Sequence, residues 1–513
     1  MKDNGLTSDA VPDAKAREDS DIAALASGGR ANIFGFLLRL AARLPFLFIA
    51  GRIYGPDVLG RFAYAIVVIE FAAQLATLGL KRGLAGALAQ TKRDENHVLA
   101  DAMLLTLLFS LAAAVLLMLF PQAMFPNSGL NGLDRLLPLI IVAVAGSDVA
   151  LAACAWRYDI AATVRARAII EPWTISIGAW VLSWYSLRDG LILSYVLSMI
   201  AALVASLWPM FRHFGLPRGW RPHPLRLWRM VRINIPLAAA DAVEWGSRRL
   251  DLAILGLFVS PTVVGIYYVA QQVASLPQKL KTSFEPILGP VITRNLADNN
   301  HAAIARQVSQ VGFWIIAAQA GVALALGIPG EAVMGLVGPE FVDGTLALGF
   351  LLLAEVVAAT AVVSESALVY MARHRNLIIS MMVIALQVVL SFVLILLVRN
   401  AGYGDVMLAA APAFALALAL ALGSAVKARL LGRLLHQHIM IWRPVLFLAG
   451  SAAVIVGCLF VALPHRFEWV ELALGVPAIL GVYGALIWRL GFGPEDRELF
   501  ARRKGARSGT AEA

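Results

Sequence analysis

Residues 55–65 read Gly-Pro-Asp-Val-Leu-Gly-Arg-Phe-Ala-Tyr-Ala, and residues 260–270 read Ser-Pro-Thr-Val-Val-Gly-Ile-Tyr-Tyr-Val-Ala. Five of the eleven positions match, namely Pro56 with Pro261, Val58 with Val263, Gly60 with Gly265, Phe62 with Tyr267 and Ala65 with Ala270. Proline and glycine also mark ordinary tight turns between helices. Because each copy lies between the first and second apolar segment of one half of the chain, we favour an internal repeat.

The composition around these stretches is that of a membrane protein. The 513 residues are 60% hydrophobic and only 15% charged, with a mean hydropathy of +0.76. A soluble domain is about 45–50% apolar and about 25% charged, and a soluble core of this size could not bury so much apolar surface. The sequence therefore predicts an all-α, polytopic membrane protein.

About fourteen apolar segments are long enough to cross a bilayer, which needs roughly 20 residues per helix. They are 32–52, 60–80, 100–120, 136–156, 168–187, 190–211, 233–258, 263–289, 309–328, 346–371, 377–398, 405–426, 442–463 and 468–489. Three of them (32–52, 233–258 and 263–289) carry charged residues and are the least apolar.

The Lys and Arg residues behind the net charge of +10 lie mainly in every second loop. This distribution is typical of residues that determine membrane topology, and it does not indicate a nucleic-acid partner. The loops that follow even-numbered segments, and the C-terminal tail, are rich in Lys and Arg, whereas the others carry at most one Arg each. Basic loops stay in the cytoplasm. We therefore expect an even number of spans and both termini in the cytoplasm.

The repeat and the loops together suggest a division of the chain. We expect two parallel six-helix bundles, 31–211 and 233–430, joined by a basic cytoplasmic linker at 212–232. An appended helix pair would occupy 431–490. The polar ends, 1–30 and 491–513, are predicted to be cytoplasmic tails, the first one disordered and without a signal peptide.

The segment 233–258 carries five charges, Asp241, Glu244, Arg248, Arg249 and Asp251. Facing lipid, these side chains would raise the insertion free energy by on the order of 10 kcal/mol, so they must face protein or water. Asp241, Glu244, Arg248 and Asp251 are spaced by three or four residues and share one helical face. Arg248 could belong to a structural ion pair with Glu244 or Asp251, or it could line a cavity.

Three further segments present polar stripes of the same kind. The stripes are Asn32, Arg39 and Arg43; Glu70, Gln74, Thr77 and Lys81; and Gln271, Ser275, Gln278, Lys281 and Glu285, with Lys279 close by. Facing one another, they would enclose a wet cavity rich in both cations and carboxylates. Arginine and lysine in such a cavity suit a phosphate or pyrophosphate group. Arg61, Lys81 and Glu171 lie near helix ends, where we expect them to snorkel to the interface.

The chain lacks the motifs of the common enzyme classes. It contains no Gly-x-x-x-x-Gly-Lys-Ser/Thr, His-Glu-x-x-His or Gly-x-Ser-x-Gly motif,. Its two cysteines, Cys154 and Cys458, lie in apolar segments far apart in the sequence and are expected to be buried free thiols, not a disulfide or a metal site. We expect no metal, no cofactor and no enzymatic activity, and the short outer loops argue against a membrane-embedded transferase.

Two stretches resemble a known family. They are Arg52-Ile-Tyr-Gly-Pro-Asp-Val-Leu-Gly-Arg-Phe-Ala-Tyr-Ala with Leu78-Gly-Leu-Lys-Arg-Gly-Leu, and Arg249-Leu-Asp-Leu-Ala-Ile-Leu-Gly with 260–270 and Phe284-Glu-Pro-Ile. They are similar to bacterial polysaccharide biosynthesis flippases of the multidrug/oligosaccharidyl-lipid/polysaccharide exporter superfamily. The family's Asp-Arg pair stands here in reversed order, as Arg249 and Asp251.

The resemblance implies that a polyprenyl-diphosphate-linked oligosaccharide is flipped from the cytoplasmic to the periplasmic leaflet of the bacterial inner membrane by alternating access. It also implies H⁺ or Na⁺ coupling, contact with membrane lipid, a monomeric state and an association with polysaccharide polymerase machinery. Arg39, Arg43, Arg248, Arg249, Lys279, Lys281 and Gln278 would bind the diphosphate and sugar, and Asp241, Glu244, Asp251 and Glu70 would couple or gate. The alternatives are a multidrug cation antiporter of the same superfamily, a peptidoglycan lipid-precursor flippase and a membrane-embedded transferase.

Overall fold

The computed structural model describes residues 44–91, 94–282, 292–464 and 468–493. Over these residues the chain is helical and contains no strand. Its first half contributes α2 (Gly55–Ala76), α3 (Leu80–Ala89), α4 (Glu95–Leu119), α5 (Gly132–Leu136), α6 (Ile140–Trp156), α7 (Ile160–Val164), α8 (Glu171–Leu182) and α9 (Gly190–Phe214). The π-helical turns η1 (Ala50–Tyr54) and η4 (Arg165–Ile170) precede α2 and α8.

The described part of the second half is also built from helices joined by turns and loops. It contributes α10 (Pro224–Phe258), α11 (Pro261–Thr282), α13 (His301–Gly327), α14 (Gly330–Gly335), α15 (Thr345–Met371), α16 (Arg373–Asn400), α17 (Asp405–Leu435), α18 (Pro444–Val461), α19 (Glu468–Val470) and α20 (Val476–Leu486). The 3-10 helix η5 (Pro339–Gly344) precedes α15, and π-helical turns flank α20 at Glu471–Gly475 and Ile487–Gly491.

Ten helical stretches of the described residues are long and apolar enough to span a membrane. The predicted segments 233–258 and 263–289 are helical as α10 and α11 but are too polar to count among the ten, and 168–187 is divided between η4 and α8. The all-α, multi-pass prediction is confirmed, while the count of fourteen spans stays a prediction.

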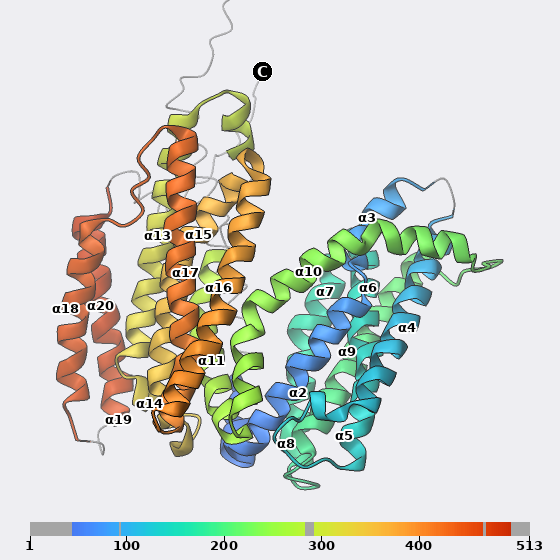
Figure 1. Ribbon diagram of the computed structural model, residues 1–513, viewed down its shortest axis with the longest axis horizontal. Coiled ribbons are helices and arrows are strands. Elements are labelled where there is room, and N and C mark those ends of the chain that lie inside the picture. The colour runs from blue at the N-terminus through green and yellow to red at the C-terminus, as the bar shows by residue number, and fades with distance from the viewer. Residues whose placement is uncertain (1–43, 92–93, 283–291, 465–467, 494–513) are drawn as a thin grey trace, which may run out of the picture.

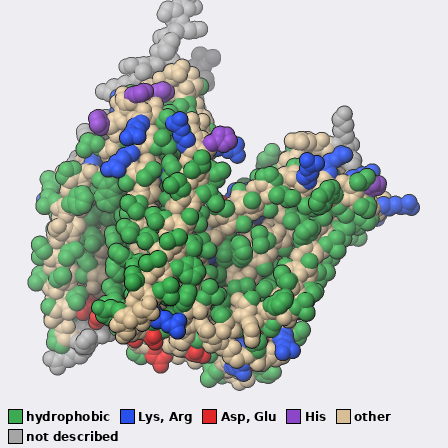
Figure 2. Space-filling model, viewed as in Figure 1, with side chains coloured by type: hydrophobic (Ala, Val, Ile, Leu, Met, Phe, Trp, Pro, Cys, Tyr) green, Lys and Arg blue, Asp and Glu red, His purple; other side chains and the backbone are tan. Residues whose placement is uncertain are grey.

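The helices form two bundles that meet at one end (Figure 1). Helices α2–α9 make one bundle and α11–α20 the other, and α10 runs obliquely from the far end of the first bundle to the place where the two meet. Figure 2 shows the molecule hollowed between the bundles at the opposite end. We call these the junction end and the open end.

The buried apolar clusters explain this arrangement. One cluster draws from both halves of the chain, with Phe62 and Ile141 packed in the same core as Tyr267 and Leu348. A second cluster belongs to the second half alone, and a third to the first half with Val231 of α10. Because apolar burial is the main source of packing free energy, the bundles are joined firmly only where they share a core.

The repeated motif lies at the centre of the shared core. Helices α2 and α11 each begin with a proline at the first or second position, where a missing N–H does no harm,, and they cross at Gly60 and Gly265. A Cβ on Gly60 would lie 2.5 Å from the backbone nitrogen of Gly265, and a Cβ on Gly265 would lie 2.9 Å from that of Gly60. The equivalent residues of the two copies therefore pack against each other, backbone to backbone.

One helix starts earlier than its apolar segment indicated. α10 begins at Pro224, where Pro is well suited to the first turn, so only residues 215–223 of the predicted linker are non-helical. Leu227, Val231 and Asn234 pack this extension onto the first bundle. Cys154 is buried as expected, but Cys458 is exposed, since none of the described helices covers its face of α18.

Candidate functional site

The polar stripe of α10 divides into buried and exposed parts. Asp241 and Asp251 are 2% and 1% exposed, whereas the side chains of Glu244 and Arg248 between them are 47% and 51% exposed. The helical face that their spacing predicts is therefore buried at its two ends, at Asp241 and Asp251, and accessible in its middle. The exposed middle of the stripe is where a solute could reach charged groups of α10.

A network of ion pairs connects this stripe to the first bundle. Gly79, with φ near +69°, turns the chain from α2 into α3 and brings Lys81 and Arg82 against α10. Arg82 Nε lies 2.9 Å from an Asp241 carboxylate oxygen, and Lys81 Nζ lies 3.8 Å from the other. Arg82 also pairs with Glu244, which is 3.2 Å from Arg248 as well. The network thus joins α3 to α10 and includes two half-exposed guanidinium groups.

Sequence reasoning missed part of this network. Arg82 was counted only as a loop charge, and Lys81 was expected to snorkel. Lys81 is instead 29% exposed and donates a 2.5 Å hydrogen bond to Gln74 Oε1. The available signal was the place of Lys81 at the end of the polar stripe of α2, with Arg82 directly after it.

A second link between α2 and α10 lies nearby. Arg249 is 4.0 Å from Glu70, and both side chains are 30% exposed. The rings of Phe71 and Trp245 stack beside them with centroids 5.2 Å apart. Two residues predicted for different roles, one in diphosphate binding and one in coupling, therefore face each other.

Asp251 has a different environment from the other charges. Its carboxylate accepts hydrogen bonds from Tyr267 Oη at 2.6 Å and from Gln271 Nε2 at 3.0 Å. All three groups lie between α10 and α11. Burial penalises the charged form of a carboxyl group, whereas the two hydrogen-bond donors favour the charged form. A proton or a cation bound at the Asp251 carboxylate would therefore act directly on the contact between α10 and α11.

The remaining predicted residues are distributed as follows. Gln278 donates a 3.1 Å hydrogen bond to Glu355 of α15. Lys279 and Lys281 occupy the last turns of α11, where the structure describes the helix but not these side chains. Arg39 and Arg43 precede residue 44 and lie outside the described residues.

A separate cluster of charges lies inside the first bundle. Arg167 pairs with Asp148 of α6 and, at 2.8 Å, with Glu171 of α8. The expectation that Glu171 snorkels is therefore wrong, since its side chain is 19% exposed and bound to Arg167. The spacing of four residues between Arg167 and Glu171 was the signal for this pair.

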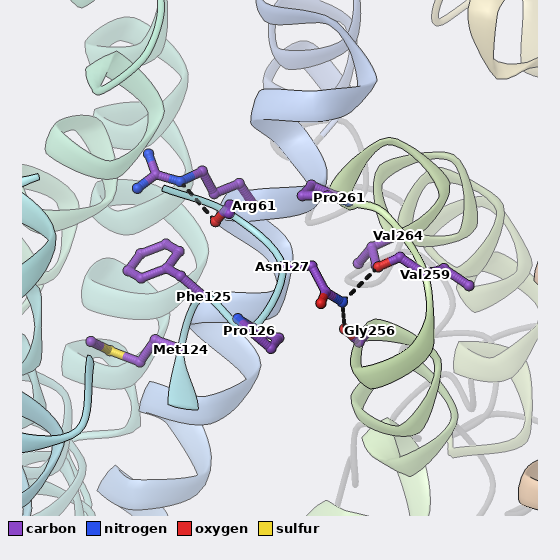
Figure 3. A pocket seen from close by; sticks show the side chains of 10 residues that line it. Arg61, Met124, Phe125, Pro126, Asn127, Gly256, Val259, Pro261 and Val264 are labelled. Carbon is purple, nitrogen blue, oxygen red and sulfur yellow. Dashed lines mark hydrogen bonds between the residues drawn. The ribbon is translucent and has the colours of Figure 1, made fainter. Parts of the chain in front are cut away.

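The junction end is closed by a polar contact between the halves (Figure 3). Asn127, in the loop between α4 and α5, donates to the carbonyl oxygens of Gly256 at 3.0 Å and Val259 at 2.8 Å, at the end of α10. The cavity beside it has a volume of about 10 Å³, which is enough for one water molecule at most.

Arg61 lies beside the same cavity, and its predicted snorkelling is wrong. It is 7% exposed, pairs with Asp134, donates to Gly129 O at 2.9 Å and stacks over Phe125 at 4.6 Å. A guanidinium that finds this many partners stays buried although it lies near a helix end.

Charge is distributed unevenly between the two ends. On the face shown in Figure 2, histidines and most basic side chains lie at the open end, and the visible acidic side chains lie at the junction end. The α3–α10 network belongs to the first bundle and α10, on one side of this hollow.

Comparison with known proteins identifies the family. The family model described as "Polysaccharide biosynthesis protein" matches residues 49–324, more than half of the chain. The chain belongs to this polysaccharide biosynthesis family. The match covers both copies of the repeated motif and the whole α2–α10 interface. Among curated proteins, none matches the chain.

Solved structures with the same fold include members of one transporter superfamily. A lipid II flippase, MurJ, in an inward-closed conformation matches with a TM-score of 0.69 and 12% identity over 89% of this chain and 98% of that one. An inward-facing multidrug resistance MATE transporter matches at 0.59 and 12% identity, covering 78% and 98%. A transporter from Pyrococcus furiosus matches at 0.53 and 14% identity, covering 81% and 96%. This member of the polysaccharide biosynthesis family therefore has the fold of these transporters, and the family resemblance seen in the sequence is confirmed.

Proposed function

We propose that this protein flips a polyprenyl-diphosphate-linked oligosaccharide from the cytoplasmic to the periplasmic leaflet of the bacterial inner membrane. Membership in the polysaccharide biosynthesis family supports a role in cell-surface polysaccharide synthesis. The shared fold with flippases and exporters supports transport as the mode of action.

The observation that carries the proposal is the half-exposed pair of guanidinium groups on Glu244. Arg82 and Arg248 both bind this carboxylate, and their side chains are 48% and 51% exposed. A diphosphate also offers pairs of oxygen atoms that an arginine can bind in a bidentate way, and it carries more charge, so it would compete with Glu244 for both arginines. Arg249, Lys279, Lys281, Arg39 and Arg43 would add positive charge, and Gln278 would bind hydroxyl groups of the sugar.

Movement of the cargo would follow from the unequal joining of the bundles. The shared core around Gly60 and Gly265 would act as the pivot, and opening at the junction end would break the Asn127 contacts. Breaking the Arg82–Asp241 and Arg249–Glu70 pairs would accompany a change at the open end. Protonation of, or Na⁺ binding at, Asp251 would then couple an ion gradient to the change between states, with Asp241, Glu244 and Glu70 as gating acids.

The orientation in the membrane belongs to the same proposal. The basic loops favour a cytoplasmic side for the open end and for both termini. The diphosphate would enter from that side, with the prenyl chain remaining in the bilayer. We expect a monomer in contact with membrane lipid, which delivers its cargo to polysaccharide polymerase machinery.

A peptidoglycan lipid-precursor flippase is the second candidate, favoured by the match to a lipid II flippase over 89% of the chain. The test uses wild-type protein in proteoliposomes with three cargoes, a fluorescent polyprenyl-diphosphate oligosaccharide, lipid II and an organic cation. Our proposal expects rapid flipping of the first cargo. Rapid flipping of lipid II alone would establish the second candidate, and transport of the cation alone would make the protein a multidrug antiporter.

A further inference from the structure

A groove separate from the α3–α10 network opens at the open end of the second bundle. It lies between the first turns of α16 and the last turns of α17 and has a volume of about 420 Å³. Its lining residues are Arg375, Ile378, Ile379, Val426, Arg429, Leu430 and Arg433. Nothing in the proposed transport cycle uses these side chains.

The groove is amphiphilic along its length. On α17, Val426, Arg429, Leu430 and Arg433 recur at intervals of three and four and share one face. Because α16 and α17 are joined by the short turn at 401–404, they run antiparallel, and Arg375 of α16 lies at the same end as Arg433. The apolar side chains continue from the arginines toward the middle of the bundle.

The positive charge of this groove is uncompensated within the described part of the chain. Arg375, Arg429 and Arg433 are all exposed, and none of them forms an ion pair with a described acidic residue. In this they differ from Arg82 and Arg248, which are bound to carboxylates. A ligand with an anionic group would supply the missing counter-charge.

A hydrogen-bonded network around the buried Lys427 and Asn376 fixes the walls of the groove. Lys427, 5% exposed, lies 2.9 Å from both Glu365 of α15 and Ser380 of α16. Asn376 of α16 donates to the same Glu365 at 3.1 Å. These bonds hold α16 and α17 at a set separation directly under the arginines, so the groove is preformed and a ligand need not order it.

We propose that this groove binds an anionic phospholipid of the surrounding membrane. The phosphate would lie among Arg375, Arg429 and Arg433, and an acyl chain would follow Ile378, Ile379 and Val426. The neighbouring side chains of Leu377 and Met382, 57% and 65% exposed, give this flank a lipid-facing surface. A soluble phosphate would use the arginines and leave the apolar half of the groove empty, so a lipid matches the site better.

The test measures lipid retention by native mass spectrometry of full-length protein released from detergent, titrated with phosphatidylglycerol or phosphatidylcholine. We expect one phosphatidylglycerol to bind more tightly than any phosphatidylcholine. The triple variant Arg375→Gln/Arg429→Gln/Arg433→Gln should bind it roughly ten- to a hundredfold more weakly, since each arginine near an anionic lipid contributes about 1 kcal/mol.

A matched variant, Arg221→Gln/Arg226→Gln/Arg229→Gln, removes the same charge from exposed positions at the same end and should keep wild-type binding. An equal loss of phosphatidylglycerol affinity in both triple variants would show that binding depends only on net charge, which would contradict a specific site in the groove. Equal binding of the two lipids by wild type would also overturn it, as would displacement of phosphatidylglycerol by glycerol phosphate alone. Displacement only by a polyprenyl phosphate at lower concentration would assign the groove to the cargo instead of a membrane phospholipid.

Discussion

Gly60 and Gly265 occupy the same position in the two copies of the repeated motif, and their backbones are in mutual contact where α2 crosses α11. A Cβ on either residue would collide with the first turn of the opposite helix, at Pro261 or Pro56. The repeat is therefore also a place where the two halves of the chain are in contact backbone to backbone. A pivot at this point would keep its geometry while the open end changes width.

The first prediction concerns this crossing. Gly60→Ala should destabilise the protein by about 1–3 kcal/mol, because the added methyl group forces α2 and α11 apart in a packed core. Thermal unfolding in detergent measures the effect. Gly349→Ala is the control, since nothing lies within 4 Å of a Cβ there and alanine favours a helix over glycine. Equal stability of Gly60→Ala and wild type would contradict the close approach.

The second prediction concerns the buried pair Arg61–Asp134. Asp134→Asn should lower the free energy of unfolding by about 3–5 kcal/mol, because it leaves a buried guanidinium without its counter-charge. The exposed pair Arg157–Glu95, with side chains 43% and 31% exposed, provides the comparison. Glu95→Gln should change stability by less than about 1 kcal/mol. Similar losses in the two variants would mean that Arg61 is not buried.

The third prediction concerns Asn127 at the junction end. Asn127→Ala removes two hydrogen bonds to α10 and should shift the protein toward states open at this end by about 1–3 kcal/mol. Spin labels at Leu133 and Leu336, in a Cys458→Ser background, report the separation by pulsed electron resonance. The variant should populate longer distances, and Gln122→Ala in the same loop should not. Identical distance distributions in all three proteins would show that the Asn127 hydrogen bonds do not keep the junction end closed.

The fourth prediction concerns Asp251 as the coupling group. Asp251→Asn keeps a side chain of the same shape between Tyr267 and Gln271 but cannot gain or lose a proton. Flipping by this variant should lose its dependence on an imposed pH or Na⁺ gradient, while exchange without a gradient continues. Glu331→Gln, at the junction end on α14, is the control. An unchanged gradient dependence of Asp251→Asn would remove this residue from the coupling mechanism.

The sequence predicted which residues share a helical face but not which helix they meet. Periodicity alone identified the stripe of α10, and Asp241 and Asp251 are buried as the insertion free energy requires. Their partners Arg82 and Tyr267 come from other helices, and a single sequence carries no signal for those pairings. Arg61 illustrates the same limit, since its position near a helix end suggested snorkelling while Asp134, far along the chain, decided its burial.

The fold was predicted more fully than the site because lipid imposes stronger rules than local chemistry. A helix is required wherever an apolar segment crosses the bilayer, so element type followed from length and hydropathy. The close packing of the two repeat copies was not predicted, although both glycines were identified. Hydropathy is the weakest guide at α10 and α11, because the polar faces of these helices meet protein and not lipid.

The account depends most on Arg82 and Arg248 as ligands of the diphosphate, and one measurement tests this directly. Flipping of a polyprenyl-diphosphate oligosaccharide is compared in proteoliposomes for Arg82→Gln/Arg248→Gln, for the charge-matched Arg226→Gln/Arg229→Gln and for wild type. We predict a loss of roughly tenfold or more in the first variant, because each charge-assisted bond contributes about 1.5–3 kcal/mol, and a wild-type rate in the second. Wild-type flipping by Arg82→Gln/Arg248→Gln would contradict the claim that these arginines hold the cargo.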